Sequence, residues 1–248
     1  MSQVKWSVEH LVHVDSTNTW LAQRARGGAN PGLAVYSDFQ SAGRGRLDRE
    51  WHAPAGSSLL CSALLAAPTS PTAPQWVVVA AALALGDALE RLSARRPALK
   101  WPNDVLYGDL KVAGLLAEVV VTERGALVVV GLGLNLTDVD PAFAAATTVR
   151  EATGLTLSPA QVLDAYLDAL GRRCEALATP EGPRELAAAY VAHLSTLGQR
   201  VRIELVGAQV HGLAVGVDDE GALMIDTGSE IRTFSAGDVV HVRGEDTR

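Results

Sequence analysis

The order of apolar and polar positions divides the chain into two unlike parts. Up to about residue 195, apolar runs alternate with helical patterns, whereas residues 200–242 form short alternating runs separated by turn residues. Period-two alternation between turns predicts strands, and apolar positions at three- and four-residue steps predict helices. We therefore expect a larger domain over residues 1–195 and a small β-barrel of about five strands over residues 196–248.

Local signals place the elements of the larger domain. Strands are expected over residues 4–14, 33–39 and 57–65, and a hairpin of two strands that are apolar on both faces over residues 112–122 and 126–136. Such strands belong in the centre of a sheet that helices cover. Helical patterns occupy residues 19–26, 75–92, 158–177 and 184–194, while residues 137–157 are expected to be mostly loop, with room for a short helix.

Two helix starts can be read in detail. Ser158, Pro159 and Gln161 combine a cap, a proline in the first turn and a glutamine three residues after the cap. The helix that follows has one apolar stripe, which predicts a buried face. Asp15 or Ser16 is expected to cap the helix over residues 19–26 by accepting its free backbone N–H groups.

Composition and charge narrow the class of protein. The chain has 248 residues, a formal net charge of −7 and no basic tail, so bulk nucleic-acid binding is not expected. Cys61 and Cys174 lie far apart without metal or redox spacing and are expected in the core. The N-terminus lacks a secretory signal, and the longest apolar run, residues 76–85, is too short for a bilayer. A reduced cytoplasmic location and no membrane association are therefore expected.

The segment at residues 39–51 is the first candidate for chemistry. It contains two glycines, three arginines and a closing aromatic: Gly43, Gly45, Arg44, Arg46, Arg49 and Trp51. Glycine lets a backbone approach a ligand closely, and guanidinium groups match phosphate and carboxylate oxygens. The segment predicts a cover that closes over an anion. A basic surface loop explains the same residues as well when the loop is taken by itself.

Three further motifs strengthen the first. Ser16, Thr17 and Asn18 stand at a strand end and a helix start, where they either hold a polar ligand group or simply cap the helix. Residues 100–104 combine a tryptophan with Asn103 and Asp104 in a turn, and Lys111 begins the next strand. Gly131, Gly133 and Asn135 end an apolar strand. A dinucleotide fingerprint is rejected there, because the third glycine and the following helix are missing.

These motifs, taken in order, resemble the biotin–protein ligase family over nearly the whole chain. The residues that carry the resemblance are Ser16, Thr17, Asn18, Gln40, Gly43, Arg44, Gly45, Arg46, Trp51, Lys100, Trp101, Pro102, Asn103, Asp104, Lys111, Val112, Ala113, Gly114, Gly131, Leu132, Gly133, Leu134 and Asn135. The resemblance implies an α+β fold, with a mixed sheet flanked by helices as in class II synthetases and an SH3-like C-terminal barrel. The first motif starts at residue 16, which leaves no room for the helix-turn-helix of repressor members, so DNA binding is not expected.

The resemblance also implies a reaction. Biotin and ATP, with Mg²⁺, would form biotinyl-5′-AMP, which then acylates a lysine of a biotin carboxyl carrier domain. An edge of the catalytic sheet would serve either for a homodimer or for the acceptor.

Residue roles follow from the same resemblance. The catalytic residues would be Lys111, Arg46 and Asp104, with Asp104 also placed on the metal. Biotin would contact Ser16, Thr17, Asn18, Gln40, Gly43, Arg44, Arg46, Lys111, Gly114 and Gly133. ATP would contact Arg46, Arg49, Trp51, Asn103, Lys111, Asn135 and Arg243. The loop over residues 43–51 would order over the adenylate and exclude water.

Three other functions remain compatible with the sequence. A lipoate or octanoate ligase or transferase shares the fold, and competition between biotin and lipoate would separate it. A non-catalytic biotin or nucleotide sensor would bind without forming an adenylate. A bare structural domain is disfavoured by the clustered glycine, arginine and tryptophan residues.

Overall fold

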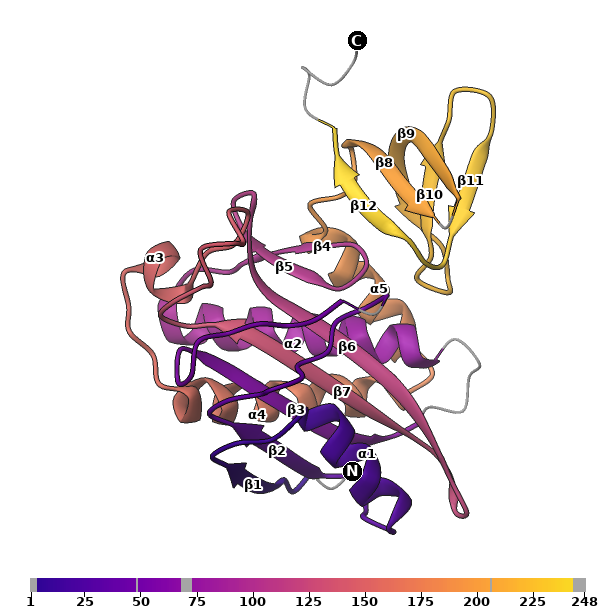
Figure 1. The fold of residues 1–248 in the computed structure, drawn as a ribbon. Coiled ribbons are helices and arrows are strands. Elements are labelled where there is room, and N and C mark those ends of the chain that lie inside the picture. The colour runs from indigo at the N-terminus through magenta and orange to yellow at the C-terminus, as the bar shows by residue number, and fades with distance from the viewer. Residues whose placement is uncertain (1–3, 48, 68–72, 206, 243–248) are drawn as a thin grey trace.

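The computed structural model describes residues 4–47, 49–67, 73–205 and 207–242. It contains a large α+β part and a small all-β part (Figure 1). The elements, in chain order, are β1 (Ser7–Leu11), α1 (Thr17–Arg26), β2 (Leu33–Ser37), β3 (Ser58–Ala66), α2 (Ala73–Ser93), β4 (Ala98–Lys100), β5 (Asp104–Tyr107), β6 (Leu110–Thr122), β7 (Gly125–Asn135), α3 (Val149–Thr153), α4 (Pro159–Leu177), α5 (Gly182–His193), β8 (Arg200–Leu205), β9 (Ala208–Val217), β10 (Leu223–Asp226), β11 (Ile231–Phe234) and β12 (Asp238–His241).

The large part is built on a seven-stranded mixed sheet in the order β1-β2-β3-β7-β6-β5-β4. The edge strand β1 runs parallel to β2, and the other neighbours are antiparallel. The predicted mixed sheet is therefore confirmed, and so is the hairpin, which forms β6 and β7. Because β7 lies between β3 and β6, the most apolar strands occupy the middle of the sheet.

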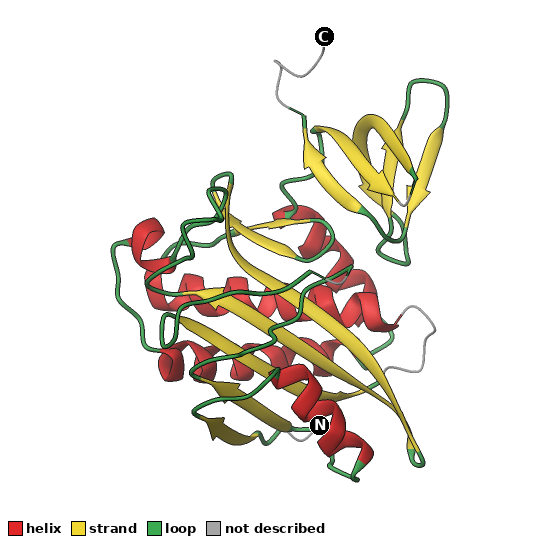
Figure 2. Ribbon diagram, in the orientation of Figure 1, coloured by secondary structure: helices red, strands yellow, loops and turns green. Residues whose placement is uncertain are grey.

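Helices cover both faces of this sheet, as Figure 2 shows. On one face, α2 and α4 pack against residues such as Ala113, Leu115 and Val130. On the other face, α1 places Leu21 against Val120 in a smaller cluster. Successive side chains of a strand point to opposite faces, so β6 contributes to both clusters. The face that carries α1 also carries the long connection from β2 to β3, which crosses in front of the strands (Figure 1).

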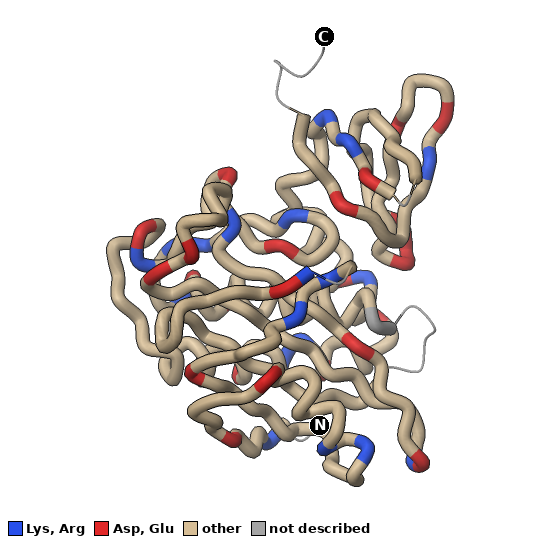
Figure 3. Tube along the Cα trace, viewed as in Figure 1, with Lys and Arg blue, Asp and Glu red and all other residues tan. Residues whose placement is uncertain are grey.

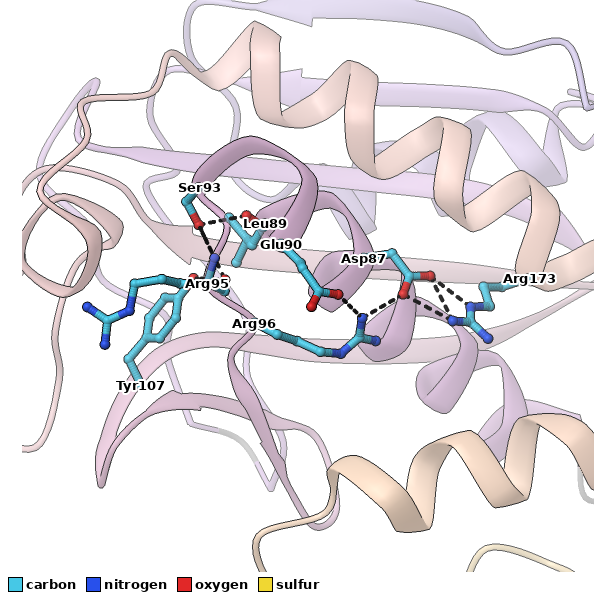
Figure 4. Close-up of polar contacts among 8 residues, drawn as sticks. All are labelled: Asp87, Leu89, Glu90, Ser93, Arg95, Arg96, Tyr107 and Arg173. Atoms are coloured by element: carbon cyan, nitrogen blue, oxygen red, sulfur yellow. Dashed lines mark hydrogen bonds and ion pairs between the residues drawn. The ribbon is translucent and has the colours of Figure 1, made fainter.

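A group of charges fixes α2 against α4 on the opposite face (Figure 4). The Asp87 carboxylate accepts from Arg173 Nε of α4 at 2.9 Å and lies 2.9 Å from Arg96 Nη1. Arg96 also pairs with Glu90 at 2.8 Å. These side chains pair with one another, which explains why the otherwise apolar helix α2 can contain the charged Asp87.

The two helix starts behave differently. The capping box at Ser158 and Gln161 is present, as predicted. The predicted cap of α1 is wrong, because Ser16 makes no side-chain capping bond and Asp15 accepts from the Ser16 N–H instead. Gln40, distant in sequence, supplies the cap: its Oε1 accepts from the Thr17 N–H at 2.7 Å.

The small part is a five-stranded antiparallel sheet in the order β11-β10-β9-β8-β12, which confirms the predicted C-terminal β domain. Two tryptophans of the large part donate to the turn between β9 and β10. Trp101 Nε1 donates to the Gly221 carbonyl at 3.1 Å, and Trp76 Nε1 donates to the Asp219 carbonyl at 3.2 Å. The position of the domain boundary at residues 195–196 stays a prediction. Of the helices in the described ranges, none has both the length and the apolarity that crossing a membrane requires.

Candidate active site

A cavity of about 620 Å³ lies on the sheet face that carries α1, beneath the connection between β2 and β3. Nearly all the residues predicted to bind a ligand line it. They are Ser16, Thr17, Asn18, Gln40, Arg44, Arg46, Arg49, Trp51, Asn103, Asp104, Lys111, Gly114, Gly133 and Asn135. Segments between Ser16 and Asn135 that are distant in the sequence thus line the same cavity, as expected for a ligand site between a sheet and its covering loop.

Two predicted residues are exceptions. Gly43 does not line the cavity, because its role is within the loop: the Trp51 N–H donates to the Gly43 carbonyl at 2.9 Å, and a Cβ at Gly43 would overlap the Trp51 backbone. The contact of Gly43 with biotin stays a prediction, and the structure shows at Gly43 a close backbone approach that only glycine permits. Arg243 lies outside the described residues.

Trp51 lies flat on the two glycines of the central hairpin. Gly114 and Gly133 are paired in register on β6 and β7. A Cβ at Gly114 would come within 3.2 Å of Trp51 Cζ3, and a Cβ at Gly133 would overlap the indole ring. Trp51 Nε1 is buried without an acceptor among the described residues. A buried donor beside a cavity is satisfied when a ligand brings an acceptor.

Arg46 carries a positive charge with weak partners in the cavity wall. Its guanidinium donates to Asn103 Oδ1 at 3.4 Å and to the Gly237 carbonyl at 3.5 Å, both long bonds. Burial lowers the pKa of Arg46, and the charges of Asp238 and Asp104 only partly oppose that shift. A partly desolvated guanidinium with weak partners favours binding of an anion.

Lys111 and Asp104 form a close pair in the cavity wall. Lys111 Nζ lies 2.6 Å from Asp104 Oδ1 and 5.6 Å from the centre of the Trp51 ring. Asn103 donates to the Leu115 carbonyl at 2.6 Å. The turn before β5 is thereby fixed to β6, so Asp104 and Lys111 face each other across neighbouring strands.

The start of α1 forms a compact polar network. Thr17 donates to Gln40 Oε1 through its hydroxyl at 3.0 Å, and Ser62 Oγ lies 2.8 Å from Thr17 Oγ1. Ser62 also lies 2.6 Å from Asn18 Oδ1. Ser16, Thr17 and Asn18 are all buried. The network fixes the polar end of the cavity before a ligand arrives.

The sequence did not single out several cavity residues that the fold brings in. Residues 139–146 contribute a wall that includes Phe143, whose ring stacks on His52 with centroids 6.2 Å apart. From the small domain, Asp238 lines the cavity and pairs with Arg49. Phe143, an aromatic residue in an alanine-rich loop, was a visible signal in the sequence. The contribution of Asp238 depends on domain packing.

The charges around the cavity are mixed, with five Lys or Arg and six Asp or Glu residues in its lining. Figure 3 shows basic segments along the connection that crosses the front of the sheet. Within the described part of the chain, no group of three His, Cys, Asp or Glu side chains could hold a metal ion. Asp104 is the one acidic residue here that was predicted as a ligand, and Lys111 already engages it. Mg²⁺ is commonly bound by one carboxylate plus substrate phosphates, so the residues present fit a metal that enters with a nucleotide.

Fold and cavity define a class, namely mixed-sheet proteins whose basic glycine-rich loop covers an anion-binding cleft. The sequence profile of the biotin/lipoate A/B protein ligase family matches residues 11–135, and that of the biotin protein ligase C terminal domain matches residues 196–242. The chain belongs to the biotin protein ligase family.

Individual relatives agree with this assignment. The biotin–[acetyl-CoA-carboxylase] ligase of Mycobacterium tuberculosis is 39% identical over 94% of this chain and 88% of that protein. The enzyme of the same name from Paracoccus denitrificans is 36% identical over 87% of this chain and 92% of its own. The biotin protein ligase of Aquifex aeolicus, solved in complex with biotin and ATP, superposes with a TM-score of 0.82 at 26% identity, covering 96% of this chain and 99% of that one.

Proposed function

We propose that this protein is an ATP-dependent ligase that activates biotin as biotinyl-5′-AMP and transfers it to a lysine of a biotin carboxyl carrier domain. The observation that carries the proposal is the convergence of Arg46 and Lys111, from different segments, on one cavity with a buried polar end. Binding a carboxylate beside a triphosphate requires such a geometry, because the two anions repel each other.

The polar network at the start of α1 and an apolar side chain on β6 suit the ring and the tail of biotin. Ser16, Thr17 and Gln40 supply hydroxyl and amide groups for a ureido ring at the buried end. Leu116, which lies on the cavity face of β6 two residues after Gly114, suits an aliphatic tail. We assign biotin to this side of the cavity, with Arg44 among the residues that contact it.

Arg46 and Lys111 would perform the first step by electrostatics. A carboxylate oxygen of biotin attacks the α-phosphorus of ATP; a new P–O bond forms, the bond to the β-phosphate breaks, and pyrophosphate leaves. Negative charge on the α-phosphate rises during the attack, and two fixed cations stabilise it. Arg49, Asn103, Asn135 and Trp51 are assigned to the nucleotide, with Mg²⁺ entering on its phosphates.

The second step is attack of the acceptor lysine amine on the carbonyl carbon of the adenylate. The C–N bond forms, the bond to the AMP oxygen breaks, and the amine proton leaves to solvent or to a carboxylate. Closure of the loop at residues 43–51 would keep water from the mixed anhydride until the acceptor arrives. The acceptor is a carrier domain of a biotin-dependent carboxylase, and the homodimer stays a prediction.

We also propose a cytoplasmic location, which the two free cysteines support, Cys61 being fully buried and Cys174 half-buried.

The test is transfer to a carrier domain. Protein, ATP, Mg²⁺ and biotin are incubated with a purified biotin carboxyl carrier domain, and the intact mass of that domain is measured. The proposal predicts one biotinyl addition at the acceptor lysine, none on a Lys→Arg acceptor and none with lipoate in place of biotin. Lipoyl addition at a comparable rate would contradict the substrate assignment.

A further inference from the structure

Glu118 places a carboxylate beside the candidate site. It follows Gly114 and Leu116 at two-residue steps on β6, and residues at such steps share one face of a strand. Gly114 and Leu116 line the cavity, but Glu118 does not. Its side chain is 26% exposed. Any influence of Glu118 on a ligand must therefore pass through its neighbours.

Those neighbours are two cavity residues from different elements. Glu118 Oε1 lies 2.8 Å from Arg44 Nη1, on the covering loop. Glu118 Oε2 accepts from Asn18 Nδ2, on α1, at 2.8 Å. One carboxylate thus joins the loop to the helix start, and each of its oxygens holds a different side chain that lines the cavity.

Glu118 also determines the orientation of the Asn18 amide. An ionised carboxylate only accepts hydrogen bonds, so the amide nitrogen of Asn18 must face it and the amide oxygen must face away. Asn18 Oδ1 lies 2.6 Å from Ser62 Oγ, which fits that orientation. A Cβ at Gly131 would overlap Asn18 Oδ1, so the strand behind leaves this side chain little room. Asn18 thus links Glu118 on β6 to Ser62 on β3 at the polar end of the cavity.

The ion pair with Glu118 holds the half-exposed guanidinium of Arg44 in place. The Arg44 side chain is 50% exposed, and a long flexible side chain loses rotamer freedom when a ligand immobilises it. Glu118 engages part of the guanidinium, which has five N–H donors, so others remain available for a ligand oxygen. A cation held in place before binding loses less entropy when the ligand arrives.

We propose that Glu118 is a positioning residue for biotin, acting through Arg44 and secondarily through Asn18. This inference rests on the proposed function, because Arg44 is assigned to biotin. It predicts that removing the Glu118 charge weakens biotin binding and shortens retention of the adenylate, while the rate of adenylation at saturating biotin and ATP changes little.

The first test is Glu118→Gln, which keeps the size and one acceptor oxygen but removes the charge. The matched control is Glu123→Gln, at the exposed turn between β6 and β7. We expect Glu118→Gln to raise the KM for biotin about threefold to tenfold, a range suited to a partly exposed charged pair. The rate constant for release of biotinyl-adenylate should rise by a similar factor, and kcat and the control should stay within about twofold of wild type. Equal KM values for the two variants would overturn the proposal.

The second test asks whether the effect passes through Arg44. In an Arg44→Ala background, Glu118→Gln should change the KM for biotin by less than about twofold, because the partner is gone. The same factor in both backgrounds would mean that Glu118 acts on the fold alone, which overturns the proposal. If Glu118→Gln does not fold, Glu118→Asp enters the same cycle, since it keeps the charge but shortens the reach to Arg44. A wild-type protein that forms no biotinyl-adenylate would refute the proposed function itself. That result is distinct from any comparison of KM values between variants, which requires an active enzyme.

Discussion

Replacing Lys111 by methionine removes the cation while keeping the length of the side chain. Lys111 Nζ lies 2.6 Å from Asp104 Oδ1 at the cavity wall, and the Asp104 side chain is only 24% exposed. The variant therefore has two effects. It removes a charge that stabilises the developing negative charge on the α-phosphate, and it leaves a carboxylate without its partner beside the triphosphate.

The size of the expected loss follows from those two effects. One fixed donor or charge aimed at a developing anion contributes about 2–4 kcal/mol, or roughly 10²–10³ in rate. Like charges about 4 Å apart at an effective dielectric constant near 20 repel by about 4 kcal/mol, which screening by solvent reduces at this partly open site. We therefore expect at least about a 10²-fold slower formation of biotinyl-adenylate.

Single-turnover formation of biotinyl-adenylate, quenched and measured by mass, is the assay. Lys5→Met, an exposed site near β1, is the control for loss of one positive charge. The double variant Asp104→Asn with Lys111→Met should be no slower than Lys111→Met, because Asp104 acts through Lys111. A loss under about tenfold for Lys111→Met would refute the assignment of the charge to this lysine. A slower double variant would give Asp104 an independent role, such as metal binding.

Three other substitutions or reactions test separate parts of the site. Arg46→Gly should form adenylate more slowly, because one of the two cations at the α-phosphate is lost. It should also release adenylate faster, because Arg46 spans from the loop to Asn103 and to the small domain; an unchanged release rate, followed by trapping with hydroxylamine, would count against this. Gly133→Ala should slow adenylation by about tenfold or more, since the added methyl overlaps the Trp51 ring and displaces it; full activity would show that Trp51 does not rest there. Burial raises the pKa of the Cys61 and Cys174 thiols to about 12 each. In the native protein at pH 8, both thiols should therefore react with a thiol reagent about 10³-fold more slowly than an unperturbed cysteine, and in the unfolded protein they should react at the ordinary rate. Rapid labelling of the native protein would refute this burial.

The elements that the sequence predicted well are those set by local rules. The capping box at Ser158 and Gln161 depends on residues three positions apart, and the β6–β7 hairpin depends on two apolar runs around Gly125. The composition of the candidate site was also largely predictable, because most cavity residues belong to motifs with distinctive residue types.

The features that the sequence did not predict depend on long-range contacts. The cap of α1 comes from Gln40, whose approach requires β2 and the following loop to pass the helix start. Gly43 looked like a residue that contacts ligand, but its need for a close backbone contact became visible only when Trp51 was placed beside it. Glu118 belongs to no motif, and its position between Arg44 and Asn18 follows from strand alternation combined with the path of the loop.

The central claim is that this cavity joins biotin to the α-phosphate of ATP. The most direct test is mass spectrometry of the purified protein mixed with biotin, ATP and Mg²⁺, without an acceptor, alongside a matched sample with lipoate. The account predicts a biotinyl-5′-AMP peak that depends on ATP and is lost in Lys111→Met. Formation of lipoyl-adenylate instead, or of neither product by a folded protein that binds biotin, would contradict it.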